Sequence, residues 1–344
     1  MSNAIQVEVV LSHSEHLPVV DVWLVVDILR ATTVMTRWFE AGGVTLYPAE
    51  STEGAKRLAE RLRGGGETPV LMGEQNAIAP QGFDLGNSPL DITPELCKKY
   101  SCAVMATTNG TKALLKALST GMPVLVASAR NAMSALDLAL SKGRRIGIFC
   151  SGRKGRPAWD DTLCAGLLTA ALAEFSPEVH LADSARLALL TWQSSRDFLT
   201  SLKSADHAVF LGRIGFGEDI VFASETDVAH TVPELREVPD GEGLLPCLKE
   251  GLRAGTPSHA SLRRVLPGNA AGPSLLEGSG RRHLAAISSF SDEDTEGAAL
   301  SDGTDSGVSG SGVLDFGSFS PDGSQVFLGG ENFRKHYRSK SKKI

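Results

Sequence analysis

Short apolar runs alternate along the chain with stretches in which apolar residues recur at helical spacing. The apolar runs cover residues 19–26, 69–72, 103–106, 124–126 and 145–150. Helical spacing covers residues 50–62, 112–118, 131–140 and 162–173. The run at 19–26 is almost continuously apolar, as expected of a parallel strand buried on both faces. The pattern predicts repeated βα units and an α/β layered fold with a largely parallel or mixed sheet.

A short internal match is compatible with two related βα lobes. Aligning Thr32 with Thr111 also aligns Gly42 with Gly121, and each glycine precedes a further apolar strand. Any two βα units share this order of strand, turn and helix, so chance explains the match equally well.

The junction at residues 25–33 joins the end of an apolar strand to the start of a helix. Asp27 stands at the carboxyl end of the predicted strand, and Thr32 and Thr33 occupy positions typical of helix-capping hydroxyls. Free N–H groups and the positive end of the helix dipole favour an anion there. A carboxylate beside that anion makes sense mainly when a divalent cation lies between them. The alternative is that Asp27 only caps the turn and pairs with Arg30 at the surface.

Acidic, hydroxyl and amide side chains recur in loops that follow other predicted strands. Glu74 and Asp84 lie in glycine-containing loops after one strand-like run. Residues 107–111 form a second strand-to-helix junction, rich in hydroxyl and amide groups. Asp160 and Asp161 open a predicted helix, where capping alone would also explain two acids. Loops of this kind usually carry function.

These elements, in this order and spacing, resemble the 2-phosphosulfolactate phosphatase family from about residue 5 to residue 240. The residues that carry the likeness are Asp27, Arg30, residues 31–33, Gly73, Glu74, residues 82–89, residues 107–111, Ala127, Ser128, Asn131, Asp161, Ala165, Gly166 and a closing segment at 214–233. One departure is the Gln-Asn-Ala at residues 75–77, where family members tend to have paired glycines.

The resemblance implies an activity and a cofactor. Members of the family are described as magnesium-dependent acid phosphatases that release phosphate from 2-phospho-3-sulfolactate, a step towards coenzyme M in methanogens. It therefore implies a phosphoric monoester hydrolase that acts on a small anionic phosphate ester with Mg²⁺.

Charge considerations assign roles within these loops. A phosphate monoester dianion needs cations and donors around its oxygens, and Mg²⁺ prefers a few carboxylates with water and phosphate oxygen. The predicted metal ligands are Asp27, Glu74, Asp84 and Asp161, with Asp160 in reserve. The predicted catalytic residues are Asp27, Arg30 and Asp161. The predicted substrate-binding residues are Thr32, Thr33, Asn87, Ser88, Asn109, Gly110, Thr111, Asn131 and Arg153.

Two details of the chemistry stay open. Asp27 could be the nucleophile, but haloacid-dehalogenase phosphatases have a second acid two residues later, where this chain has Leu29. This favours metal-activated water. A second anionic group of the substrate would need its own positive partner, and surface solvation explains each candidate equally well. The candidates are Arg130, Arg153, Lys154 and Arg156.

Two other functions compete with a metal-dependent phosphatase. Cys150 precedes Arg156 by the spacing of cysteine-dependent phosphatases, in which the loop and the Arg bind phosphate and lower the pKa of the thiol. Against it, Phe149 replaces the usual His, and Pro157 delays the expected helix. The same loops would also suit a phosphate-ligand binding protein without catalysis.

Composition sets wider bounds. The chain has 344 residues, 42% of them hydrophobic, and a net charge of -6, which argues against general nucleic-acid binding. Its five cysteines lack metal-ligand spacing, and its histidines form no ligand pair, which excludes an obvious zinc site. No apolar run reaches the roughly 18 residues needed to span a bilayer, and the start lacks the features of a signal peptide. A cytoplasmic protein without membrane partners is expected, and homo-oligomerisation is left open.

The chain changes character after residue 240. Residues 1–240 are the predicted catalytic region, and residues 241–277 an extension of uncertain role. Residues 278–344 are predicted to be disordered, because residues 278–330 are dominated by Ser, Gly and Asp. Their end, residues 334–343, has six Lys or Arg, which suits an acidic partner or simple solvation.

Overall fold

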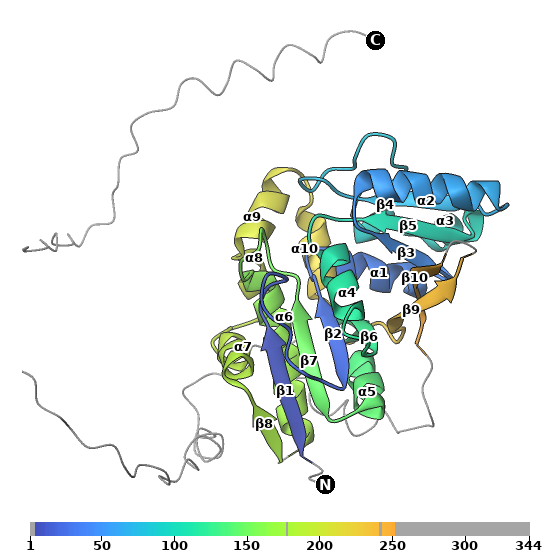
Figure 1. The fold of residues 1–344 in the computed structure, drawn as a ribbon. Helices are drawn as coiled ribbons and strands as arrows, with labels where there is room; N and C mark the ends of the chain where they lie inside the picture. Colours follow the sequence, from blue (N-terminus) through green and yellow to red (C-terminus); the bar gives the residue numbers. More distant parts are fainter. Residues whose placement is uncertain (1–3, 177, 241–242, 252–344) are drawn as a thin grey trace, which may run out of the picture. The chain divides into compact units, whose positions relative to one another are not determined.

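One mixed sheet organises the computed structural model, which describes residues 4–176, 178–240 and 243–251. In these residues the sheet has ten strands in the order β4-β5-β3-β10-β9-β6-β2-β7-β1-β8, with helices packed on it (Figure 1). The strands are β1 (Ile5–Val10), β2 (Val22–Val26), β3 (Leu46–Ala49), β4 (Pro69–Gly73), β5 (Cys102–Ala106), β6 (Val124–Ala127), β7 (Arg145–Cys150), β8 (Val179–Leu181), β9 (Pro233–Pro239) and β10 (Leu244–Glu250). The predicted α/β layered fold is confirmed.

Helices follow most of the strands and correspond to the predicted helical stretches. They are α1 (Ala31–Glu40), α2 (Thr52–Gly64), α3 (Pro94–Lys99), α4 (Gly110–Leu118), α5 (Ala132–Lys142), α6 (Trp159–Phe175), α7 (Asp183–Gln193), α8 (Phe198–Lys203), α9 (Asp206–Arg213) and α10 (Gly217–Ser224), with the 3-10 turns η1 (Pro89–Asp91) and η2 (Ala129–Asn131). The two internally similar units, β2-α1-β3 and β5-α4-β6, both belong to the one sheet.

The sheet is parallel except where the β9-β10 hairpin enters it. β10 pairs antiparallel with β3 and β9, and β9 pairs antiparallel with β6. The hairpin thus joins the β4-β5-β3 part to the β6-β2-β7-β1-β8 part. β10 lies beyond residue 240, where the predicted catalytic region ends, yet it belongs to the same sheet. The predicted extension after residue 251 and the tail at 278–344 lie outside the described residues.

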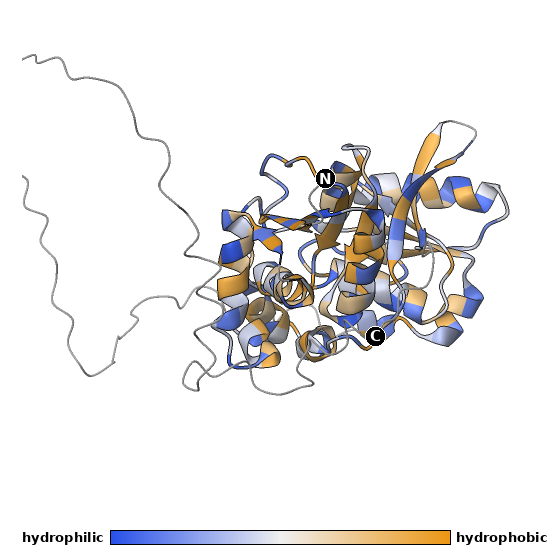
Figure 2. Ribbon diagram, turned by 90° about the horizontal axis from the view of Figure 1, so that it is seen from below, coloured by the Kyte–Doolittle hydropathy of each residue, from blue (hydrophilic) through white to orange (hydrophobic). Residues whose placement is uncertain are grey.

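Both faces of the sheet are buried. Trp23 and Val25 of β2 pack with α1 and α4 on one face, whereas Leu24 and Val26 pack with α5 and α6 on the other. The alternation arises because successive strand side chains point to opposite faces. Apolar residues accordingly gather in the central strands, while the helices mix polar and apolar positions (Figure 2). The run predicted at 19–26 forms a strand only from Val22, and Val19 is exposed.

Strands β2 and β7 are neighbours, and the chain continues from each of them toward a different edge of the sheet. β2 continues through α1 to β3 on one side of the sheet, and β7 continues through α6 to β8 on the other. The two strands run parallel, with Val26 opposite Cys150, so their carboxyl ends meet. Ligands of open α/β sheets bind in the crevice at such a topological switch point.

Candidate active site

Asp27 follows β2 at this switch point and is held by the turn into α1. Its Oδ1 accepts the Ala31 N–H at 3.2 Å, and its own N–H donates to Thr32 Oγ1 at 3.1 Å. The Thr33 hydroxyl donates to the Ile28 carbonyl at 2.8 Å. The sequence predicted Thr32 and Thr33 as capping residues. The cap position is instead Arg30, and both threonines lie inside α1. Their hydroxyls instead hold the turn that carries Asp27.

The start of α4 lies against the same carboxylate. A Cβ added to Gly110 would come within 2.7 Å of Asp27 Oδ2 and 2.5 Å of the Ala31 Cβ, so only glycine fits there. Asn109 is the N-cap residue of α4 but makes no side-chain capping bond. Thr111 Oγ1 donates to the Thr107 carbonyl at 3.1 Å, which closes the turn before the helix. The amino-terminal ends of α1 and α4 thus both flank Asp27.

Asp161, near the start of α6, joins the carboxyl ends of β2 and β7. Its Oδ1 accepts the Ile28 N–H at 3.0 Å. Its Oδ2 accepts the Ser151 hydroxyl and the Gly152 N–H, each at 3.0 Å. Asp27 and Asp161 were both predicted as site residues from separate segments, and the structure brings them to the same end of the sheet, where Asp161 contacts the residue after Asp27.

Burial sets the electrostatics of this pair. It raises the pKa of Asp27 to about 6, against the lowering effects of His207, the Ala31 N–H and Ser151. The pKa of Asp161 is raised well above its ordinary value, first by burial and then by the charges of Asp160 and Asp27. Two ionised carboxylates that destabilise each other favour a cation or a proton between them. Their oxygen donors fit Mg²⁺, which proteins commonly bind through one or two carboxylates plus water and phosphate oxygen.

The other two predicted metal ligands, Glu74 and Asp84, lie in the loop after β4. Glu74 accepts the Ala77 and Thr108 N–H groups, each at 2.7 Å, and so ties its own loop to the start of α4. Asp84 is exposed and accepts the Leu71 N–H of β4 at 2.8 Å. Within the described residues no group of three or more His, Cys, Asp or Glu is arranged to hold a metal. The four predicted ligands therefore do not form one set.

Asp160 and His207 extend the site on the side of α6 and α9. Asp160 is buried, and its Oδ2 lies 3.6 Å from His207 Nδ1. Both line a pocket of about 580 Å³ together with Arg153, Lys154 and Arg156. Nothing in the sequence singled out His207 from the other histidines, because its neighbour in space is 47 residues away along the chain.

Arg30, predicted as catalytic, has its guanidinium buried among three partners. It donates to Asp219 Oδ2 of α10 at 2.7 Å and to the Ala77 carbonyl at 2.8 Å, and lies 4.3 Å from the centre of the Phe216 ring. The Ser88 hydroxyl donates to the other Asp219 oxygen at 2.6 Å. The Asn87 Oδ1 beside Ser88 is buried without a hydrogen-bond partner among the described residues.

Comparison with known proteins assigns the chain to a family. The family model described as 2-phosphosulpholactate phosphatase matches residues 9–238. The chain belongs to this family. The match covers Asp27, Asp161, Asp219 and both helix starts at the switch point, and it ends before β10. The resemblance stated from the loop motifs is confirmed.

Curated relatives of the chain carry the same family name. A probable 2-phosphosulfolactate phosphatase of Thermus thermophilus is 38% identical over 224 residues, which is 64% of this chain and 91% of that protein. Proteins of the same description from Deinococcus radiodurans and Clostridium perfringens strain SM101 are each 33% identical, over 225 and 213 residues. These cover 64% and 62% of this chain and 91% and 85% of those proteins.

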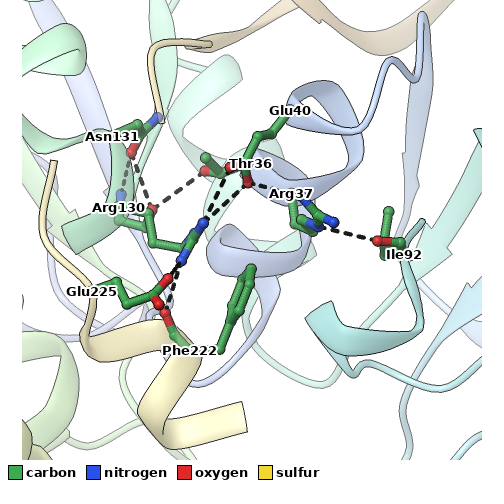
Figure 3. Close-up of polar contacts among 9 residues, drawn as sticks. Thr36, Arg37, Glu40, Ile92, Arg130, Asn131, Phe222 and Glu225 are labelled. Carbon is green, nitrogen blue, oxygen red and sulfur yellow. Dashed lines mark hydrogen bonds and ion pairs between the residues drawn. The ribbon is translucent and has the colours of Figure 1, made fainter. Parts of the chain in front are cut away.

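Arg130, a candidate for the second anion of a family substrate, is instead a buried structural residue. Its guanidinium pairs with Glu225 and Glu40, donates to the Phe222 carbonyl at 3.1 Å and stacks 3.7 Å from the centre of the Phe222 ring (Figure 3). It thereby holds the end of α10 against α1. Neighbouring Asn131, predicted to bind substrate, is fully buried. Its amide accepts from Ser128 and donates to the Val126 and Thr231 carbonyls.

Cys150 does not have the environment of a nucleophilic thiol in this member of the family. It is fully buried at the end of β7, and burial raises its pKa well above the ordinary value, with Asp161 adding to the effect. Cysteine-dependent phosphatases need the opposite shift. The following loop folds back on itself, since Arg153 and Arg156 exchange backbone hydrogen bonds of 2.8 and 3.1 Å.

No helix in the part of the chain that the structure describes is long and apolar enough to cross a bilayer.

Proposed function

We propose that the chain is a magnesium-dependent phosphatase that hydrolyses a small anionic phosphate monoester, 2-phospho-3-sulfolactate, to 3-sulfolactate and phosphate. The observation that carries the proposal is the burial of Asp27 and Asp161 together at the β2-β7 switch point, between the starts of α1 and α4. Membership of the 2-phosphosulpholactate phosphatase family supports the reaction type, and the description of the relatives as probable 2-phosphosulfolactate phosphatases supports the substrate.

The residues suit phosphate hydrolysis through charge placement. Asp27 and Asp161 would hold Mg²⁺, whose positive charge would stabilise the phosphate oxygens and lower the pKa of a bound water. The positive ends of the α1 and α4 dipoles, at Thr32, Thr33, Asn109, Gly110 and Thr111, favour the phosphate itself. Because both helix starts are already closed by internal hydrogen bonds, they offer a preorganised environment for developing charge.

Phosphate release from a panel of esters tests this function. The panel includes 2-phospho-3-sulfolactate, other small phosphorylated acids and neutral alkyl phosphates, each assayed with Mg²⁺ and with EDTA. Turnover that requires Mg²⁺ supports the proposal. Stoichiometric binding of these esters without release of phosphate would favour the binding-protein alternative instead.

The basic loop at residues 153–156 is expected to select esters that carry a second acid group. Its side chains line the pocket beside Asp160, and Arg153 stacks 5.6 Å from the centre of the Phe210 ring. We expect Arg153→Ala to raise KM for such esters about tenfold, because a charge-assisted hydrogen bond is lost at a partly exposed site. The effect should shrink as salt concentration rises.

Steady-state kinetics of Arg153→Ala on acidic and neutral esters would measure this effect. Arg57→Ala is a matched control, since Arg57 lines a different pocket beside α2. Equal changes for both ester classes in the Arg153 variant would remove the loop from substrate selection.

The buried thiol of Cys150 is expected to be dispensable. Cys150→Ser should keep kcat within about tenfold of the parent, because neither a nucleophile nor a metal ligand is lost. Iodoacetamide should not inactivate the protein, since the thiol is inaccessible and its pKa is raised. A variant that binds substrate but has lost activity by orders of magnitude would instead establish a cysteine nucleophile.

A further inference from the structure

His207 lies beside the buried residue Asp160, and one of its ring nitrogens faces the Asp160 carboxylate. It lies in the first turn of α9, about one-fifth exposed, and its Nδ1 is 3.6 Å from Asp160 Oδ2. Asp160 is 2% exposed. Its other oxygen, Oδ1, is buried and has no hydrogen-bond partner among the described residues. Because Asp160 occupies the Nδ1 side of the ring, Nε2 is the nitrogen left for a ligand.

Three basic side chains of the loop at residues 153–156 line the pocket beside this pair. Residues of the basic loop, Trp159 and the first turn of α9 surround about 580 Å³ of space. The charged side chains that line it with His207 are Arg153, Lys154, Arg156, Asp160 and Asp206. The pocket adjoins the proposed reaction centre, because Asp160, which contacts His207, directly precedes Asp161 in the chain.

Hydrolysis of an alkyl phosphate needs an acid that the residues assigned so far do not supply. When the P–O bond breaks, charge develops on the ester oxygen, and an alkoxide is a poor leaving group unless it gains a proton. Asp27 and Asp161 are committed to the cation, and the arginines of the loop do not deprotonate in proteins. Of the other charged side chains that line the pocket, His207 is of the residue type that most often transfers protons in catalysis.

We propose that His207 is the catalytic acid of the reaction, donating the Nε2 proton to the leaving ester oxygen, and that Asp160 is the positioning residue that orients the ring. The electron pair of the breaking P–O bond stays on the ester oxygen, which leaves as the alcohol. The oxygen of water forms the new bond to phosphorus, and the proton it loses passes to solvent, from which the imidazole is reprotonated. The inference rests on the proposed phosphatase function.

Leaving-group dependence tests this role, because a nitrophenolate departs without a proton and an alkoxide does not. We expect His207→Ala to lower kcat on 2-phospho-3-sulfolactate about a hundredfold or more, the usual contribution of a general acid. On p-nitrophenyl phosphate the same variant should stay within about threefold of the parent. His207→Gln, which keeps a polar side chain but cannot transfer a proton, should show the same selectivity.

Two further variants complete the experiment. Asp160→Asn should lower kcat on the alkyl ester by a smaller factor, with the same sparing of the nitrophenyl ester, because the ring is less well oriented. His180→Ala, at an exposed position of the edge strand β8, is the matched control and should change neither activity.

The outcomes separate the inference from the proposed function. Equal losses on both esters, or full activity on the alkyl ester, in folded His207 variants would overturn the acid role. A parent protein that releases phosphate from neither ester would contradict the phosphatase function itself. Circular dichroism and thermal unfolding of each variant establish that the protein remains folded.

Discussion

Asp27→Asn is expected to lower kcat by about a hundredfold to a thousandfold, the usual loss when a preorganised charge stabiliser is removed. The amide keeps an oxygen to accept the Ala31 N–H, so the turn into α1 survives while the negative charge at the switch point is lost. Removal of Mg²⁺ with EDTA should abolish turnover of the parent, and added Mg²⁺ should restore it. Steady-state phosphate release, with and without metal, measures both effects.

Asp84→Asn is the matched control for this change. It also exchanges a predicted metal ligand for its amide, but at an exposed position where the side chain only accepts the Leu71 N–H. We expect its kcat to stay within about threefold of the parent, as for surface changes outside a site. Full activity of the parent in excess EDTA would contradict the magnesium assignment, and unchanged kcat in Asp27→Asn would contradict the site.

Arg30→Ala is expected to lower the free energy of unfolding by about 3–5 kcal/mol, since it leaves the carboxylate of Asp219 buried without its partner. The change also removes the hydrogen bond to the Ala77 carbonyl and the stacking on Phe216, which tie the start of α1 to the loop after β4 and to the residue before α10. Urea unfolding followed by circular dichroism measures the loss. The double variant with Asp219→Asn should recover part of it, because no unpaired buried charge remains.

Arg186→Ala provides the comparison. Its ion pair with Asp183 is 3.7 Å long and exposed, so we expect its loss to cost under about 1 kcal/mol. If Arg30→Ala kept the stability of the parent while kcat fell by orders of magnitude, the arginine would act on the phosphate directly and not through α10.

Local pattern in the sequence determined the elements of the fold and one half of the candidate site. The apolar run of β2 is long enough and uniform enough to require burial on both faces, and that alone predicts a central parallel strand. Asp27 then lies at a carboxyl end simply by chain order. Asp161 was identified in the same way, as an acid in the first turn of α6, and the spacing of such junctions along the chain also identified the family.

The order of the strands was decided by the tertiary structure alone, and with it the partners of most site residues. The β9-β10 hairpin separates β3 from β6, and no local pattern records which strands it will join. Arg30 meets Asp219, which is 189 residues away, and His207 meets Asp160 through the packing of α9 on α6. Glu74 was predicted as a ligand because it is an acid in a loop, and only the fold shows that its oxygens accept the Ala77 and Thr108 N–H groups. Hydrophobic periodicity shows which side of a segment is buried. Contacts between residues of distant segments depend instead on where each segment lies in the sheet.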